Sequence, residues 1–220
     1  MKSDAKLRED IIAELEWDPS FDSRNIGVAV KNGIVTLSGH VESFAQSWEA
    51  QRAAQNIAGV IAVANEIQVK LAGDTQRSDT EIAEACIEAL GANVVVPSTV
   101  KVTVHNAWVN LGGAVLFWYQ KRAAEKAVRY LRGVKGINNN IVVKPLMGKP
   151  VSEGEVRSKI ESAFQRHAHR DADAIHVTVQ GSEVTLDGHV PTWNERQAAE
   201  IAAWAAPGVT RVDDRLVISP

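Results

Sequence analysis

The sequence predicts an α+β protein made of three tandem αββαβ domains, each with two helices packed on a small three-stranded mixed sheet. Ten-residue segments beginning at Asn32, Asn106 and Gly181 align at offsets of 74 and 75 residues. The same offsets keep two sets of glycines in register, which are Gly39, Gly113 and Gly188, and Gly59, Gly133 and Gly208. Each copy also changes from helical to strand periodicity at the same place. We therefore expect domains at residues 1–72, 78–145 and 151–220, called modules 1, 2 and 3 below.

Each module is expected to begin with a helix that has one apolar face. In module 1, Leu7, Ile11 and Leu15 recur every four residues, which places them on one side of a helix. The corresponding residues are Ile82, Cys86 and Leu90 in module 2, and Val156, Ile160 and Phe164 in module 3. The candidate N-caps of these helices are Ser3, Asp79 and Ser152.

A β-hairpin is expected after the first helix. Residues 26–30 and 35–37 carry apolar side chains at every second position, as a strand with one buried face requires. Asn32-Gly33 between them is a strong signal for a tight hairpin turn. Its weaker counterparts are Asn106-Ala107 and Gly181-Ser182.

An alanine-rich second helix and a last strand complete each module. The helical segment 50–57 has counterparts at 124–131 and 199–206. The register glycines Gly59, Gly133 and Gly208 are expected to end these helices, because C-terminal caps favour residues that tolerate positive φ. A domain this small buries only about 60% of its unfolded surface, so we expect the modules to pack against one another.

The composition is that of an ordinary globular protein. The chain has 220 residues, of which 45% are hydrophobic and 23% charged, and its formal net charge is −3. Its one cysteine, Cys86, has no internal disulfide partner, and no apolar run reaches the roughly 18 residues of a membrane-spanning helix. The charged N-terminal segment lacks the apolar core of a secretory signal, which favours a cytoplasmic location.

The repeated segments resemble the BON domain family. The resemblance rests on Asn32–Val41 (NGIVTLSGHV), on the alanine-rich helix, on Gly59-Val60 and on the strand ending Asn65-Glu66-Ile67. Module 2 departs most, with Ala107 in place of the turn glycine and a doubled Gly112-Gly113. The family implies αββαβ modules proposed to bind phospholipid surfaces in stress-related proteins of the bacterial envelope. It implies no catalysis, and it makes the periplasm the alternative location.

Positive charge is concentrated in module 2. The net charge is −3 for residues 1–73, +3 for residues 74–147 and −3 for residues 148–220. On the second helix of module 2, Arg122, Lys126 and Arg129 are spaced to form one stripe. Trp118 and Tyr119 directly precede this stripe.

This pattern predicts an anionic phospholipid membrane surface as a partner. Aromatic rings favour the headgroup region of a membrane, and each cation near the surface adds about 1 kcal/mol. The candidate lipid- or anion-binding residues are Trp118, Tyr119, Lys121, Arg122, Lys126, Arg129 and Arg132. The alternative is an ordinary solvated charged face, with Trp118 packed into the core like its counterparts Phe44 and Trp193.

The sequence does not predict metal binding, catalysis or nucleic-acid binding. His167 and His169 are two residues apart, which does not place them on one face of a helix, and neither a metal nor a cofactor is expected. The sequence has no nucleophile-elbow or phosphate-loop motif. The G-x-x-G at Gly133–Gly136 joins a helix to a strand rather than two helices, so nucleic acid is not an expected partner.

The sequence therefore predicts a non-enzymatic binding module of a bacterial stress-related protein that engages anionic phospholipid through the basic helix of module 2. Two alternatives stay open. One is a soluble protein-interaction or chaperone-like scaffold that binds protein partners. The other is small-ligand or ion binding at the glycine turns around Gly39, Gly113 and Gly188. The sequence does not indicate how many copies of the chain associate.

Overall fold

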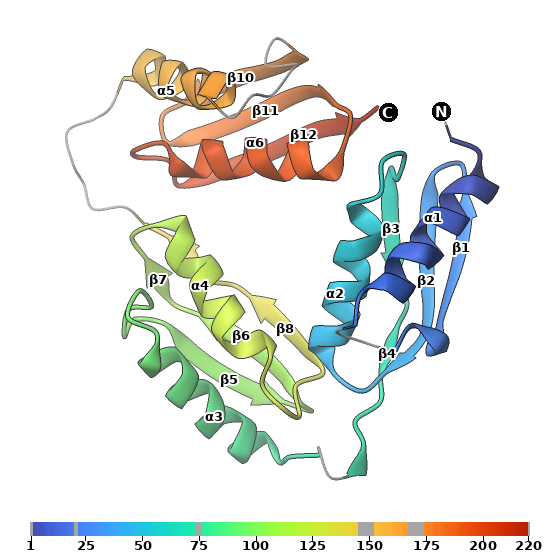
Figure 1. Ribbon diagram of the computed structural model, residues 1–220. Coiled ribbons are helices and arrows are strands. Elements are labelled where there is room, and N and C mark those ends of the chain that lie inside the picture. The colour runs from blue at the N-terminus through green and yellow to red at the C-terminus, as the bar shows by residue number, and fades with distance from the viewer. Residues whose placement is uncertain (1, 20–21, 74–75, 145–151, 167–173, 220) are drawn as a thin grey trace.

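The computed structural model describes residues 2–19, 22–73, 76–144, 152–166 and 174–219. Three α+β modules follow one another along the chain, as the repeat predicts (Figure 1). In each module, the two helices and the sheet enclose one apolar core. The second helix of every module is turned toward the centre of the molecule (Figure 1).

Module 1 shows the strand order that all three modules share. Its elements are α1 (Asp4–Trp17), a 3-10 turn (Ser23–Asn25), β1 (Ile26–Lys31), β2 (Ile34–Val41), α2 (Phe44–Gln55), β3 (Ala62–Asn65) and β4 (Gln68–Val69). β1 is antiparallel to β2, whereas β3 and β4 both run parallel to β2. The central strand β2 therefore lies between β1 on one side and β3 with β4 on the other.

Modules 2 and 3 repeat this arrangement. Module 2 contains α3 (Asp79–Ala92), β5 (Lys101–His105), β6 (Trp108–Gly112), β7 (Ala114–Val115), α4 (Trp118–Arg129), β8 (Gly136–Asn139) and β9 (Val142–Val143). Module 3 contains α5 (Glu153–Arg166), β10 (Ile175–Gln180), β11 (Glu183–Val190), α6 (Trp193–Ala205) and β12 (Arg211–Ile218). The last strand is continuous in module 3 and divided in the other two modules, so the predicted three-stranded mixed sheet is confirmed with this local variation.

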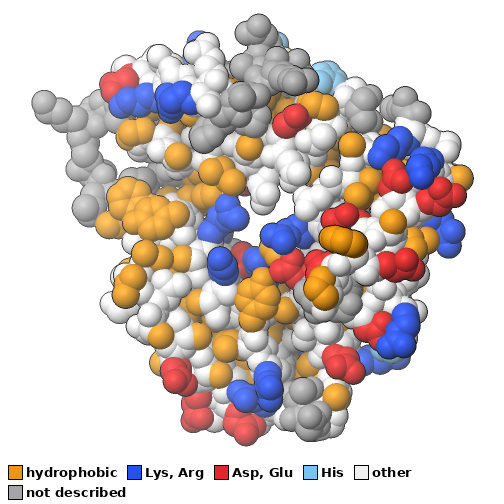
Figure 2. Space-filling view, viewed as in Figure 1, with side chains coloured by type: hydrophobic (Ala, Val, Ile, Leu, Met, Phe, Trp, Pro, Cys, Tyr) orange, Lys and Arg blue, Asp and Glu red, His pale blue; other side chains and the backbone are white. Residues whose placement is uncertain are grey.

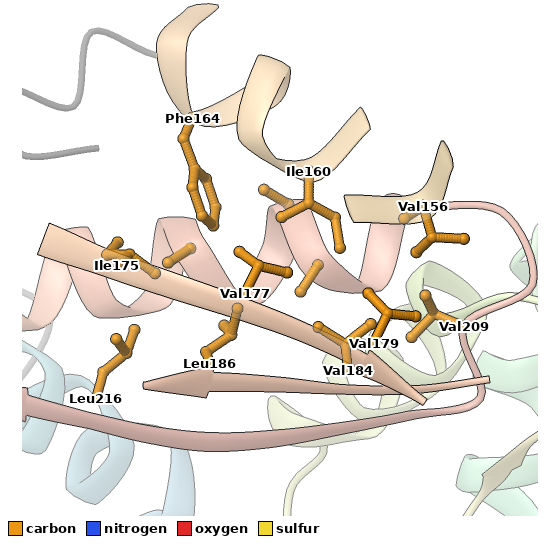
Figure 3. Close-up of a cluster of buried hydrophobic side chains, with 14 of the residues drawn as sticks. Val156, Ile160, Phe164, Ile175, Val177, Val179, Val184, Leu186, Val209 and Leu216 are labelled. Carbon is orange, nitrogen blue, oxygen red and sulfur yellow. The ribbon is translucent and has the colours of Figure 1, made fainter. Parts of the chain in front are cut away.

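The apolar stripe of each first helix points into the core of its own module. Figure 3 shows Val156, Ile160 and Phe164 of α5 directed toward Val177 and Leu186 of the sheet. The equivalent stripes of the other modules are also buried, namely Leu7, Ile11 and Leu15, and Ile82, Cys86 and Leu90. The four-residue spacing thus predicted the buried face of all three helices.

An acidic residue at the start of each first helix binds the hairpin turn of the same module. The carboxylate of Asp79 accepts hydrogen bonds from the backbone N–H groups of Asn106 (2.9 Å) and Ala107 (2.8 Å). In the same way Asp4 binds the turn at Asn32 and Gly33, and Glu153 binds the turn at Gly181. These hydrogen bonds connect the start of the helix to the turn that joins the first two strands.

This contact corrects one of the predicted N-caps. Ser3 and Ser152 accept hydrogen bonds from the backbone N–H groups three residues later, as expected for caps. The prediction of Asp79 is wrong, because Ser78 caps α3 and forms a capping box with Glu81. Asp79 is the first residue of the helix, and its carboxylate binds the hairpin turn instead.

The repeated glycine in the second strand allows two stretches of backbone to approach closely. Gly39, Gly113 and Gly188 have φ values of 109°, 102° and 130°. A Cβ atom at Gly39 would overlap the carbonyl oxygen of Asn25, and one at Gly188 would overlap that of Ala174. Both the positive φ and the close approach exclude larger side chains at this position.

The second helices end earlier than the sequence predicts, at Gln55, Arg129 and Ala205. The glycines expected to end them do adopt positive φ, at Gly59 (105°), Gly133 (88°) and Gly208 (84°). They lie three or four residues beyond the helices, in the turns that lead to the last strands. The glycines therefore shape those turns and do not cap the helices.

The modules pack against one another in a closed ring. The first residue of each second helix is aromatic and contacts a neighbouring module. Phe44 of module 1 packs on the core of module 2, and Trp193 of module 3 packs on the core of module 1. Trp118 of module 2 stacks on Trp204 of module 3, with ring centroids 5.9 Å apart and planes inclined by 7°. Each module thus contacts both others, as their small size leads one to expect.

Candidate functional site

The basic stripe of α4 lies where modules 1 and 3 approach module 2. Arg122 and Lys126 are exposed, whereas only 11% of the Arg129 side chain is accessible. Figure 2 shows basic, acidic and hydrophobic side chains close together near the centre of the visible face. Arg129 is therefore covered by module 1, whereas Arg122 and Lys126 stay open to solvent.

A groove of about 650 Å³ runs between α4 and the C-terminal part of α6, and we call it the α4–α6 groove. Its walls are apolar and come from two modules. The aliphatic lining includes Leu116, Val143, Ile201 and Val209, and the aromatic lining consists of Phe117, Trp118, Tyr119 and Trp204. An apolar cavity with a few polar groups is typical of small-molecule sites.

Three cations line the α4–α6 groove, which are Arg122, Lys126 and Arg129. No aspartate or glutamate lies among its lining residues in the part of the chain that the structure describes. The guanidinium carbon of Arg122 is 4.9 Å from the centroid of the Trp118 ring, which orients this cation beside the aromatic wall. The groove thus combines apolar walls with two exposed cations, Arg122 and Lys126, while Arg129 is paired with Glu125.

Arg129 also joins module 2 to module 1. Its guanidinium carbon lies 3.6 Å from the centroid of the Trp48 ring, and its Nη2 donates a hydrogen bond to the Glu125 carboxylate at 2.6 Å. Beside it, the hydroxyl of Tyr130 donates to the carboxylate of Glu49 at 2.7 Å, and this bond raises the pKa of Tyr130. We call this set of contacts the Arg129–Trp48 clasp.

One atom of Arg129 is not satisfied by these contacts. Its Nε is buried and has no hydrogen-bond partner among the residues that the structure describes. A buried donor without a partner is unfavourable for stability.

Two of the seven candidate residues lie away from the groove. Lys121 is half-buried, its backbone carbonyl accepts a hydrogen bond from Asn139, and burial lowers the pKa of its amine. Arg132 is exposed beyond the end of α4. The other five candidates line the α4–α6 groove, namely Trp118, Tyr119, Arg122, Lys126 and Arg129.

The α6 side of the groove is missing from the sequence prediction. Ile201 and Trp204 come from module 3, and nothing in a linear sequence places them opposite α4. One signal does exist, because Trp204 stands at the repeat position held by Gln55 and Arg129 in the other modules. Near Trp204, burial raises the pKa of Glu200, which accepts a hydrogen bond from the indole N–H at 3.3 Å.

Some residues weighed in the sequence cannot be placed in the site. His167 and His169 lie outside the described residues. Within the described residues, no three His, Cys, Asp or Glu side chains are grouped so that they could hold a metal ion. Cys86 is buried in the core of module 2, where burial raises the pKa of its thiol to about 11. No helix in the described part of the chain is long and apolar enough to cross a membrane.

Three αββαβ modules of this topology define a tandem-repeat protein of the α+β class. The chain belongs to the BON domain family, which its sequence matches at residues 3–70, 78–145 and 152–220. The match covers every module, including the divergent module 2. The resemblance noted from the sequence is therefore confirmed.

Similarity to individual proteins is more limited. Osmotically-inducible protein Y of Escherichia coli (strain K12) is 32% identical over 146 residues, which are 64% of this chain and 73% of that protein. Among solved structures, the chain matches CdsD, a structural protein of the type III secretion system of Chlamydia trachomatis. That match has 14% identity and a TM-score of 0.27 over 98% of this chain and 93% of CdsD. It is too distant to inform the fold or the function.

Proposed function

We propose that this chain is a non-enzymatic, stress-related binding protein that engages anionic phospholipid surfaces through α4. The main support is the α4–α6 groove, which joins exposed aromatic rings to three cations with no acidic residue among its described lining. The name of the Escherichia coli relative refers to osmotic induction, which supports a role in a bacterial stress response.

The accessible groups at the mouth of the groove suit a phospholipid headgroup region. Phe117 and Tyr119 stack with ring centroids 5.5 Å apart, and each is more than half exposed. Arg122 and Lys126 are exposed one helical turn apart. Each would add about 1 kcal/mol of attraction to an anionic surface, and salt would screen it. Arg129 contributes less to this surface because the Arg129–Trp48 clasp holds it.

Flotation with lipid vesicles tests this proposal. We expect the chain to float with vesicles containing phosphatidylglycerol and not with vesicles of phosphatidylcholine alone. The double variant Arg122→Glu/Lys126→Glu should weaken binding at least about 10-fold, since two attractions of about 1 kcal/mol become repulsions. Arg129 is left unchanged, because its replacement would also disturb the contact with module 1.

A matched control separates local from general charge effects. The double variant Arg157→Glu/Lys159→Glu changes the net charge equally, and both residues are exposed on α5. It should bind anionic vesicles almost as well as the native chain. Equal losses in the two double variants, or no binding by the native chain, would contradict a lipid-binding role for α4.

A second candidate function is recognition of an extended protein segment. A cleft of about 580 Å³ lies between α3 and β5, and Ile87 beside it is 63% exposed. In the described residues β5 pairs only with β6, so its other edge can form hydrogen bonds with an added strand. Ile87→Asp should remove such a partner in co-purification and leave vesicle flotation unchanged.

A further inference from the structure

We propose that the α4–α6 groove binds one free amphiphile with a single alkyl chain and an anionic head group, such as a long-chain carboxylate. This inference rests on the proposed function and narrows it from a membrane surface to a single molecule held between modules 2 and 3. It also makes module 3 part of the binding site.

The walls of the groove suit an alkyl chain. Leu116 and Val143 of module 2 face the same space as Ile201 and Val209 of module 3. The volume of about 650 Å³ lies within the range of roughly 300–1,000 Å³ that is usual for small-ligand sites. Ile201 is 38% exposed, so a bound chain would remove apolar surface from water. The lining comes from modules 2 and 3, so a bound alkyl chain would contact both modules.

The charges select the head group. Arg122 and Lys126 line this groove and are exposed, whereas Arg129, which also lines it, is paired with Glu125 at 2.6 Å. The two exposed cations can form charge-assisted hydrogen bonds with a carboxylate head group. They would repel a cationic head group.

The stacked indoles provide a direct signal of occupancy. Trp118 of module 2 and Trp204 of module 3 both line the groove and stack on each other. A chain lying against them would displace water from their rings and change their fluorescence.

The test is a titration of the full chain with sodium dodecanoate below its critical micelle concentration. Tryptophan fluorescence should saturate, and calorimetry should give one molecule bound per chain. Decanoate should bind about 16-fold more weakly, since each buried methylene changes affinity about fourfold. Dodecyltrimethylammonium, with the same chain and a positive head group, should show no saturable binding.

A pair of aspartate variants locates the site. Ile201→Asp places a carboxylate in the groove and should weaken dodecanoate binding at least about 10-fold. Val94→Asp introduces the same charge at an apolar residue that is 98% exposed and lies outside the groove, and it should leave binding unchanged. Circular dichroism checks that both variants fold. If Ile201→Asp does not fold, Lys126→Glu on the exposed rim replaces it and should weaken binding at least about fivefold.

The outcomes separate this inference from the proposed function. Absence of saturable binding at one molecule per chain, equal binding of the cationic amphiphile, or full binding by a folded groove variant would each overturn the assignment. A chain that floats with anionic vesicles but does not bind dodecanoate would overturn the inference and leave the membrane proposal standing. A chain that binds dodecanoate and does not float would refute the membrane proposal alone.

Discussion

At the residue scale, the glycine repeated in the second strand sets how closely two stretches of backbone can approach. At Gly188, φ is 130° and a Cβ atom would overlap the carbonyl oxygen of Ala174. Repetition at Gly39 and Gly113 shows that every module depends on the same close approach. The sequence revealed these positions through the repeat, but only the structure shows which backbone atoms they contact.

Replacement of Gly188 should therefore destabilise the protein strongly. We expect Gly188→Ala to lower the free energy of unfolding by more than about 2 kcal/mol, measured by urea denaturation, because the backbone must move and the φ is unfavourable. Gly154 provides the control, since it lies in α5 with open space around the Cβ position. Gly154→Ala should not lower the stability, because the added methyl group meets open space at the start of a helix. Similar effects of the two substitutions would refute this explanation.

Cys86 gives a prediction about reactivity and pH. Burial raises the pKa of its thiol from 9.0 to about 11, so the folded state favours the neutral form. This contribution to stability is complete below pH 9 and is lost as the pH rises through 11. We expect the native thiol to resist a disulfide reagent at pH 8 and to react at once in denaturant. Rapid labelling of the folded chain would show that Cys86 is accessible.

At the scale of single elements, the acidic residue that begins each first helix joins the helix to a hairpin. Asp79→Ala removes the two hydrogen bonds that backbone N–H groups of the turn donate to the Asp79 carboxylate. We expect a loss of about 2 kcal/mol in the free energy of unfolding, because hydrogen bonds to charged groups contribute about 1.5–3 kcal/mol. Glu88→Ala on the exposed face of the same helix is the control and should change stability by less than about 0.5 kcal/mol. A comparable loss in the control would assign the effect to helix charge in general.

The sequence predicted the elements better than their ends. Apolar spacing identified every first helix and every hairpin, since burial of one face imposes a period that can be read from one chain. Caps and helix ends depend instead on contacts with loops. Asp79 was therefore mistaken for a cap, and the turn glycine Gly133 was assigned to the end of a helix that stops at Arg129.

At the scale of the whole molecule, the candidate site belongs to the arrangement of modules more than to any one of them. Charge counting identified Arg122 and Lys126 because they lie on one helix. It could not identify Ile201 and Trp204, which reach the groove from another module. Nor could it show that the guanidinium of Arg129 lies on the ring of Trp48 in module 1.

Loss of the Arg129–Trp48 clasp should loosen module 1 from module 2. We expect Arg129→Ala to increase the radius of gyration in X-ray scattering and to split thermal unfolding into separate transitions, because the stacked guanidinium is removed from the contact between modules. Arg132→Ala, an exposed arginine just beyond the same helix, is the control and should leave both measurements unchanged. Unaltered scattering by both variants would mean that the remaining contacts, which include Phe44 and the Tyr130–Glu49 hydrogen bond, are enough to hold the two modules together.

Trp193 has a consequence for how the polypeptide could be rearranged. Trp193 packs the third module on the first, so every module contacts both others, and α1 begins on the same side of the molecule as β12 ends (Figure 1). We expect a circular permutant, in which the third module is translated first and a linker joins it to the first module, to form the same contacts between modules. The order in which the three modules are synthesised should therefore not decide whether they pack together.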